Sequence, residues 1–390
     1  MSPPPLMKVR KLSSFIAGKR PREDDNDPSS PSPLSWLPDE LVLQCLLHVP
    51  KTYDLNLSYV SKTLRSLVRS PELLRLRSSL PKNSIYVYFR GKKTLKPKQY
   101  WFTLRPILSS KREIEYQLIP VSNFPSHPFM YNSSAVAVGS EIFFVGGLSE
   151  PSSDLWILDT RSGEFAQGPS MKVARTCDSV VGVINGKIYM IGGCLNKKIQ
   201  VEVYDPKKRS WTVGEGPDER FRLRLMTTQL TASLGWNVYS AETAKINVYN
   251  ARQGGRLETV KMPRGKPNNV VWCMCVVADL LYVYYFREGL MWLDAKSKIW
   301  KRVVGVGCND LKALDVKFHD AVMAEYNGKL AILWPEAEGI HLVKPKIRIR
   351  CALIALDWVG DGMRGRIEWS GTVAEMPDNY SLYKIFVVSG

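Results

Sequence analysis

The chain has 390 residues, 45% of them hydrophobic, and a formal net charge of +17 at pH 7. This length can hold two domains with a large core, and since no apolar run approaches roughly 18 residues, neither a membrane span nor a secretory signal is expected. The seven cysteines have no regular spacing, which is typical of reduced thiols and favours a cytosolic or nuclear protein over a disulfide-bonded secreted one.

Residues 1–34 are predicted to form a disordered tail. They contain seven prolines and six serines and mix opposite charges without a helical or strand period. Their basic residues include Lys19, Arg20 and Arg22, a cluster of the kind that nuclear import receptors bind. We therefore expect the protein in the cytoplasm, the nucleus or both, and the alternative is a solvated tail without a targeting role.

Residues 35–80 have the pattern of a small helical module. A proline followed by two acidic residues at 38–40 is typical of a first helical turn, and Pro50 ends the apolar period that follows. A second helix is predicted over residues 54–69, and a third follows it. The apolar face of the second helix is expected to carry Val60, Leu64, Leu67 and Val68. Helices this short cannot bury their apolar side chains alone, so a partner surface is expected.

The order of short motifs in this module resembles an F-box. Leu-Pro-Asp-Glu-Leu comes first, Val-Pro follows, and Ser-Pro-Glu-Leu closes the segment of residues 35–76. The resemblance implies that the module binds the Skp-type adaptor of a cullin-based ubiquitin ligase, whereas the alternative is a helical cap on the domain that follows. The residues that it places on the adaptor-binding face are Leu37, Pro38, Leu41, Val42, Leu46, Val49 and Pro50. The residues that would complete this face, or form the module's own core, are Leu55, Val60, Leu64 and Leu67.

Residues 134–171 and 177–216 have nearly the same pattern, displaced by 46 residues. In each, an apolar run meets a two-residue turn, a second apolar run ends in a pair of glycines, and a later strand ends in Asp with an aromatic residue six positions beyond. The recurring positions are Gly146, Gly147, Asp159 and Phe165 in the first copy and Gly192, Gly193, Asp205 and Trp211 in the second. A repeat of this length with four strand-like runs predicts one blade of a β-propeller.

Each part of this pattern has a physical reason. The Asn185-Gly186 turn supplies the positive φ that a two-residue hairpin needs, and the glycine pairs permit a close approach of backbones where a side chain would clash. Apolar residues at consecutive positions, as in residues 142–145, fit a strand that neighbouring blades cover on both faces. These residues resemble the kelch repeat.

Strands that follow a turn can be traced beyond the two clear repeats, and they begin at Ile142, Ile188, Val238, Leu281 and Leu330. Residues 85–119 supply three strands of a further blade, and residues 380–388 supply a spare strand that would close the ring and hide two edges. The expected fold is an α+β multidomain chain, with a disordered tail over 1–34, a short all-α F-box module over 35–80 and an all-β kelch-type propeller over 81–390. Six blades are expected, with seven as the alternative.

The residues that metal or covalent catalysis would need are not arranged for it. The four histidines fall in different segments, and Cys273 and Cys275 lie on one side of a predicted strand, where packing inside a blade is the more ordinary role. The sequence has no phosphate-binding glycine loop. We therefore expect no metal, no cofactor and no catalytic residue.

Positive charge is concentrated in the predicted propeller. Residues 1–34 and 35–80 each contribute +2 to the total of +17, which leaves +13 for residues 81–390. The basic residues in predicted loops that could bind a client are Lys207, Lys208, Arg209, Arg220, Arg222 and Arg224. An acidic client surface would suit this charge, and nucleic acid is the less favoured partner. The alternative is a solvated basic surface without a binding role.

An F-box followed by kelch repeats resembles a large plant family of F-box/kelch-repeat proteins. The resemblance implies a non-catalytic substrate receptor of an SCF-type ubiquitin ligase. Its F-box would bind the Skp-type adaptor and through it the cullin, its propeller would hold an unknown protein client, and ubiquitin transfer would depend on proximity. Two alternatives are a propeller that binds an acidic protein or nucleic acid outside any ligase, and a small-molecule enzyme that uses the central mouth of the propeller.

Overall fold

The computed structural model describes residues 37–47, 49, 54–79, 83–91, 99–109, 111, 113–130, 133–147, 150–176, 179–194, 198–216, 230–242, 245–262, 271–285, 288–305, 321–337 and 346–389. The chain divides into two compact units, residues 1–73 and residues 74–390. The described helices are α1 (Asp39–Leu47), α2 (Asp54–Val60), α3 (Lys62–Val68) and α4 (Pro71–Ser79), and the boundary between the units falls within α4. None of these helices is long and apolar enough to cross a membrane.

The single helix predicted over residues 54–69 is wrong, because the chain forms two helices there. Ser61, between α2 and α3, is extended (φ −153°, ψ 159°), and its hydroxyl accepts a hydrogen bond from the Leu64 amide at 3.1 Å. A serine that caps a new helix in this way ends the preceding one. The break separates Val60 from the apolar face that it was predicted to share with Leu67: Val60 is 69% exposed, whereas Leu64 and Leu67 are buried.

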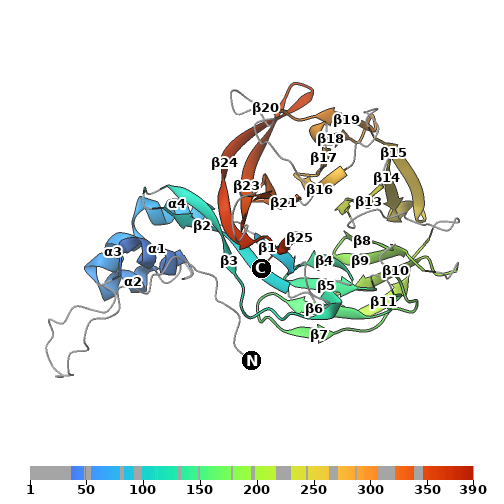
Figure 1. The fold of residues 1–390 in the computed structure, drawn as a ribbon, viewed down its shortest axis with the longest axis horizontal. Helices are drawn as coiled ribbons and strands as arrows, with labels where there is room; N and C mark the ends of the chain where they lie inside the picture. Colours follow the sequence, from blue (N-terminus) through green and yellow to red (C-terminus); the bar gives the residue numbers. More distant parts are fainter. Residues whose placement is uncertain are drawn as a thin grey trace. The chain divides into compact units, whose positions relative to one another are not determined.

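The described strands of the second unit form six sheets, which are arranged as the blades of a propeller (Figure 1). Blade one contains β25 (Tyr380–Ser389), β1 (Asn83–Gly91), β2 (Gln99–Leu108) and β3 (Ile114–Pro120), and blade two contains β4 (Ser134–Val138), β5 (Glu141–Val145), β6 (Leu155–Asp159) and β7 (Phe165–Gln167). Blade three contains β8 (Ser179–Ile184), β9 (Lys187–Gly192), β10 (Val201–Asp205) and β11 (Ser210–Val213).

Blade four contains β12 (Thr231–Leu234), β13 (Asn237–Glu242), β14 (Lys245–Asn250) and β15 (Arg256–Lys261), and blade five contains β16 (Val271–Val277), β17 (Leu280–Tyr285), β18 (Gly289–Asp294) and β19 (Ile299–Arg302). Blade six contains β21 (Val322–Tyr326), β22 (Lys329–Ala337), β23 (Lys346–Val359), β24 (Gly362–Pro377) and the short β20 (Val304–Gly305). The first-named strands of neighbouring blades contact one another, so they are the inner strands of the ring. The expectation of six blades is confirmed.

The C-terminal strand closes the ring, as predicted. β25 pairs antiparallel with β1, from Asn83 opposite Ser389 to Gly91 opposite Tyr380. On either side of it, β25 also contacts the inner strands β4 and β21 of the neighbouring blades. Blade one is therefore built from strands that are distant in sequence, and this pairing covers two edges that would otherwise be free.

Blade six departs from the other blades. Its strands β23 and β24 form a long hairpin in which Asp357 lies opposite Arg364, so the insertion predicted before Trp369 is an extension of this hairpin. The short strand β20, which follows blade five, pairs in parallel with β24 through Val304 and Gly305. The segment after blade five thus also contributes to the sheet of blade six.

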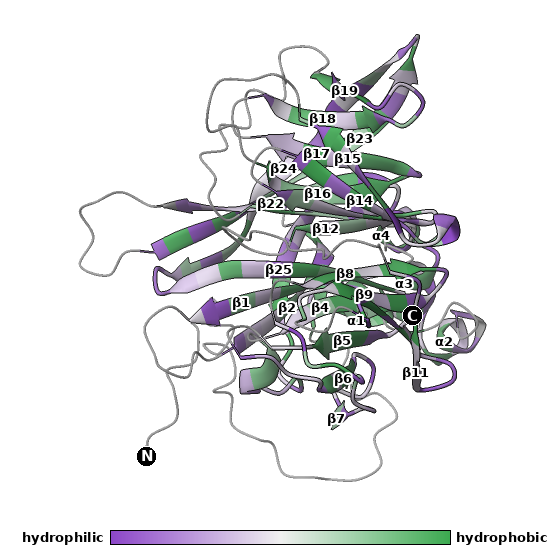
Figure 2. Ribbon diagram, turned by 90° about the vertical axis from the view of Figure 1, so that its right-hand side faces the viewer, coloured by the Kyte–Doolittle hydropathy of each residue, from purple (hydrophilic) through white to green (hydrophobic). Residues whose placement is uncertain are grey.

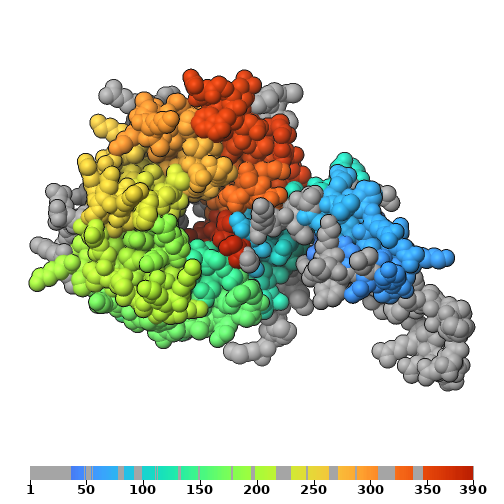
Figure 3. All heavy atoms as spheres, turned by 180° about the vertical axis from the view of Figure 1, so that it is seen from behind, coloured from blue at the N-terminus to red at the C-terminus, as the bar shows by residue number. Residues whose placement is uncertain are grey.

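The apolar side chains of a blade pack against both of its neighbours. Phe143 and Phe144 are consecutive in β5 and both fully buried, but Phe143 packs with Ile188 and Met190 of blade three, whereas Phe144 packs with Trp101 of blade one. Figure 2 shows the hydrophobic colour along β5, and the space-filling view of Figure 3 shows the blades in contact around a narrow central opening. Consecutive apolar residues therefore mark strands that are covered on both faces, as predicted.

Candidate functional site

Part of the predicted adaptor-binding face is exposed on the helices of the first unit. Leu37 is 41% exposed, Pro38 beside it is exposed, and Leu41 is half-buried in the first turn of α1. Tyr59 was not predicted as part of this face, yet its side chain is 78% exposed next to Val60. The serine that follows these two residues is the signal that could have shown them to be the end of a helix.

Other residues predicted for that face are buried, namely Val42, Leu46, Leu64 and Leu67. For Leu64 and Leu67 this burial agrees with the alternative that they form part of the helical module's own core. Val42 and Leu46 pack within the chain, and their place on the adaptor-binding face stays a prediction. Val49 is half-buried, while Pro50 and the side chain of Leu55 lie outside the described residues.

The paired glycines occupy backbone positions that other residues would strain. Gly146, Gly192 and Gly193 have left-handed φ values of 74°, 68° and 67°. A Cβ atom on Gly147 would stand 1.8 Å from the carbonyl oxygen of Glu150. Any side chain there would therefore have to displace backbone, which is the reason for the double glycine that the repeat predicted.

The Asp that ends the third strand of each repeat secures the turn into the outer strand. Asp205 Oδ1 accepts hydrogen bonds from the backbone amides of Lys207 at 3.0 Å and Lys208 at 3.3 Å. Asp159 Oδ1 accepts the Arg161 amide at 2.9 Å, and a hydrogen bond from the Arg161 side chain lowers the pKa of Asp159. The carboxylate thus accepts hydrogen bonds from turn amides that have no neighbouring strand to bond to.

The aromatic residue six positions later joins the outer strand to the rest of the blade. The Trp211 indole donates a hydrogen bond to the Pro169 carbonyl at 2.7 Å, and its ring centre lies 5.0 Å from that of Tyr204. In blade two, Phe165 stacks on Trp156 at 4.9 Å. The recurring Asp and aromatic residue are therefore structural parts of the blade.

Two family models match the chain. The model of the FKB95 kelch-repeats domain matches residues 101–374, and the model of the F-box domain matches residues 34–76. A putative F-box/kelch-repeat protein of Arabidopsis thaliana is 44% identical over 369 residues, which are 90% of this chain and 95% of the relative. The chain belongs to the F-box/kelch-repeat family.

Two further F-box/kelch-repeat proteins of Arabidopsis thaliana are similar to this family member. One is 56% identical over 258 residues, 65% of this chain and 98% of the relative, and the other is 37% identical over 373 residues, 91% and 93% of the two chains. The solved structure of YjhT covers 68% of this chain and 90% of its own at 10% identity, with a TM-score of 0.43 that carries no argument. The resemblance found in the sequence is confirmed.

The basic residues predicted to bind a client do not form one described surface in this F-box/kelch-repeat protein. Lys207 and Lys208 are exposed in the turn between β10 and β11. Arg209 of the same turn already has a partner, since it forms an ion pair with Glu141 of blade two at 2.6 Å. The predicted basic residues that lie outside the described residues are Arg220, Arg222 and Arg224 of the propeller and Lys19, Arg20 and Arg22 of the tail.

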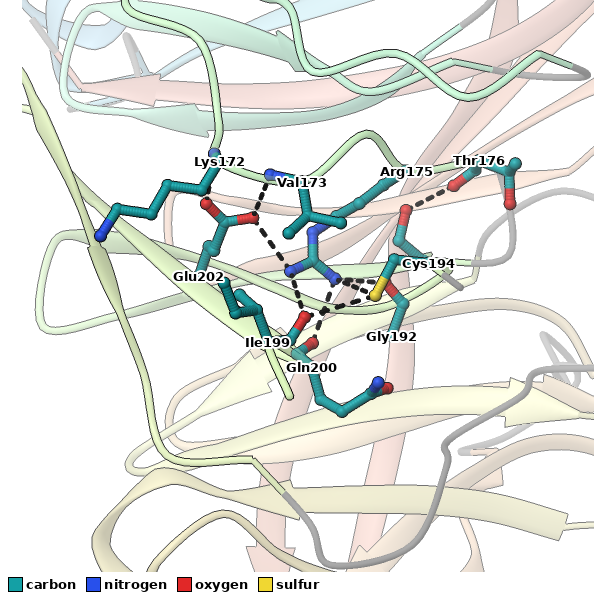
Figure 4. A network of polar contacts seen from close by, with 10 residues as sticks. Lys172, Val173, Arg175, Thr176, Gly192, Cys194, Ile199, Gln200 and Glu202 are labelled. Atoms are coloured by element: carbon teal, nitrogen blue, oxygen red, sulfur yellow. Dashed lines mark hydrogen bonds and ion pairs between the residues drawn. The ribbon is translucent and has the colours of Figure 1, made fainter. Parts of the chain in front are cut away.

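A buried ion pair links the connection after blade two to blade three, and it was not predicted (Figure 4). The side chains of Arg175 and Glu202 are both 0% exposed, and Arg175 Nη2 lies 3.1 Å from Glu202 Oε2. The guanidinium also donates to the carbonyl oxygens of Gly192, Ile199 and Gln200. Almost every donor of this buried cation is therefore satisfied by groups of blade three.

Glu202 completes the link because its carboxylate also accepts the backbone amides of Lys172 at 2.6 Å and Val173 at 3.3 Å. These amides belong to the segment that leads from blade two into blade three. An acid inside the otherwise apolar strand β10 is the signal that could have shown that a buried partner was needed. The pair is enclosed on all sides, so it holds blades together and does not act on a ligand.

The two cysteines considered for a metal site are buried. Cys273 and Cys275 both lie in the apolar cluster between blades five and six, as predicted, and burial raises the pKa of both thiols. In the part of the chain that the structure describes, no group of three or more His, Cys, Asp and Glu side chains is placed to hold a metal ion.

Proposed function

We propose that this F-box/kelch-repeat protein is a substrate-receptor subunit of an SCF-type ubiquitin ligase. The observation that carries the proposal is the set of exposed apolar side chains on a unit that matches the F-box domain, formed by Leu37, Pro38, Tyr59 and Val60. Exposed apolar side chains that gather on a small unit commonly mark a surface that a partner covers. A Skp-type adaptor is the partner that the F-box implies.

The proposed mechanism needs no catalytic group on this chain. The F-box unit would bind the adaptor and through it the cullin, while the propeller would hold a client protein. Two binding sites on one chain raise the effective concentration of the client near the ubiquitin-loaded conjugating enzyme. The bond chemistry then belongs to the partners, in keeping with an architecture that is typical of non-catalytic adaptor proteins.

Binding of the full chain to a purified Skp-type adaptor tests the proposal. A variant with Leu37→Ala, Pro38→Ala and Val60→Ala should lose binding, because truncation of a buried interface anchor commonly costs more than about 2 kcal/mol. All three side chains are exposed in the free chain, so the variant should keep its fold.

The matched control is Ile299→Ala, which removes an exposed apolar side chain from the propeller instead. It should bind the adaptor as the unchanged chain does. Failure of the intact, folded chain to bind would contradict the proposal, and the propeller would then have to be studied as a binder of protein or nucleic acid in its own right.

A further inference from the structure

Blade four departs from the repeat at the turn between its first two strands. At the second turn position, blades two, three, five and six carry Ser140, Gly186, Asp279 and Gly328, whereas blade four carries Trp236. Gly235 supplies the positive φ of 59° that the turn needs, so the indole has no part in forming it. Trp236 is 42% exposed, and the fold gives no reason for an aromatic ring at this position.

The second turn of the same blade departs as well. It contains one residue more than the corresponding turns of blades three and five and forms the short 3-10 helix η4 (Ala251–Gln253). The guanidinium of Arg252, in this helix, lies 5.9 Å from the centre of the Trp236 ring. The longer turn thus brings a cation to the only aromatic ring among these tight turns.

Arg252 differs in its partners from several basic residues of the corresponding turns. Arg161 of blade two, Arg209 of blade three and Lys298 of blade five each form an ion pair, with Asp159, Glu141 and Glu258. Among the described residues, Arg252 has no carboxylate partner. Its hydrogen-bond donors are therefore available to a ligand.

The floor between these two turns carries no charge. Asn250 Nδ2 donates to Asn237 Oδ1 at 2.7 Å, at the positions where blade three has the ion pair of Lys187 and Asp205. The two turns and this amide pair line a cavity of about 550 Å³ that is open to solvent. The residues that complete its wall are Leu234, Tyr239 and Gln253 of blade four and Asp279 and Ala295 of blade five.

We propose that this cavity binds an extended peptide segment in which a large apolar side chain is accompanied by a carboxylate. The apolar side chain would pack on Trp236, and the carboxylate would accept hydrogen bonds from Arg252. Asp279, which lines the cavity from blade five, would accept an N–H of the segment. The charge of +13 on residues 81–390 favours the approach of an acidic segment.

The residue types suit this role, because Trp and Arg are the side chains that most often serve as binding anchors. The assignment rests on the proposed function to the extent that the segment would belong to the client of the ligase. The cavity itself, however, can be tested without any ligase component.

The test measures binding of the full chain to immobilised peptides in which a phenylalanine and a glutamate stand at varied separations in a glycine-serine background. Trp236→Ser, which introduces the residue of blade two, and Arg252→Gln should each weaken the best binders by about tenfold or more. Replacing the glutamate of the peptide by glutamine should weaken its binding to the unchanged chain. The same replacement should change binding to the Arg252→Gln variant very little, because that variant already lacks the partner of the glutamate.

The matched control is Arg161→Gln, which removes an exposed charge from the corresponding turn of blade two and should leave binding unchanged. An equal loss in this control would show a general charge effect and overturn the proposal. Binding of a mixed-sequence single-stranded RNA but of no peptide would overturn it as well, as would peptide binding that neither cavity variant reduces.

The same variants separate this inference from the ligase role. Trp236→Ser should bind the Skp-type adaptor as the unchanged chain does. If the intact chain binds peptides at the cavity but does not bind the adaptor, the cavity is supported and the ligase role is rejected. Normal adaptor binding without any peptide binding would reject the cavity alone.

Discussion

Lys384 lies on the closing strand β25, and its ammonium group donates a hydrogen bond to the Ala135 carbonyl of β4 at 2.6 Å. The nitrogen is 5.7 Å from the centre of the Phe386 ring, and among the described residues no carboxylate pairs with it. Burial lowers the pKa of Lys384 from 10.5 to about 8. At neutral pH Lys384 therefore still carries its charge in the folded protein, although burial makes that charge costly.

This shift predicts how stability depends on pH. Between about pH 8 and pH 10.5 the folded chain has lost the proton of Lys384 and the unfolded chain still holds it, so the contribution of Lys384 to the free energy of unfolding rises with pH. Lys384→Met should abolish that rise, which amounts to about 2 kcal/mol between roughly pH 8 and pH 9.5. Urea denaturation of both proteins across this range measures it. Identical pH profiles would contradict the prediction.

At the scale of structural elements, the buried pair of Arg175 and Glu202 ties the entry of blade three to its strands β9 and β10. Arg175→Met would leave the Glu202 carboxylate buried without its counter-ion. We expect the free energy of unfolding to fall by about 3–5 kcal/mol, because an unpaired buried charge is far more costly than a paired one. Denaturant unfolding of the variant checks this value.

The control is Arg161→Met, the same substitution in an ion pair on the surface of blade two. Arg161 is largely exposed, so its loss should cost far less than the loss of Arg175. The double variant Arg175→Met, Glu202→Gln keeps an acceptor for the amides of Lys172 and Val173 without a buried charge. It should be more stable than Arg175→Met alone, and equal stability would show that the charge is not the cause.

At the scale of the whole molecule, stability depends on a ring that is closed by its last strand. Deletion of residues 380–390 would remove β25, expose the edge of β1 and take a neighbour away from the inner strands β4 and β21. We expect the shortened chain to unfold at lower denaturant concentration and over a broader range, since an open propeller has free sheet edges.

A synthetic peptide of residues 378–390 provides the matching test. Added in excess, it should pair with β1 and restore the unfolding midpoint, because a donated strand replaces the missing backbone partners. A peptide of the same composition in scrambled order should not. Restoration by both peptides, or an unchanged midpoint after the deletion, would contradict a role of β25 in closure.

The sequence by itself determined the domain order, the blade repeat and the closing strand. The blade repeat is encoded locally, in two-residue turns such as Asn185-Gly186, in the glycine pairs and in apolar runs such as that of β5. Such signals depend on backbone sterics and strand burial, which act over a few residues and repeat at a constant interval. The closing strand followed from a spare strand after the last blade and a first blade that lacked one. The F-box motifs likewise predicted Leu37 and Pro38 on a partner face, and both are exposed.

Only the tertiary structure decided which side chains meet. The apolar period alone did not show that Ser61 ends one helix and starts the next, although a capping serine is a local signal for such a break. Arg175 forms an ion pair with Glu202, which lies 27 positions later in the sequence, and Arg252 lies over the ring of Trp236, 16 positions earlier. Strand pairing brings these distant residues together. Such contacts depend on the register and length of several strands at once, which no local pattern contains.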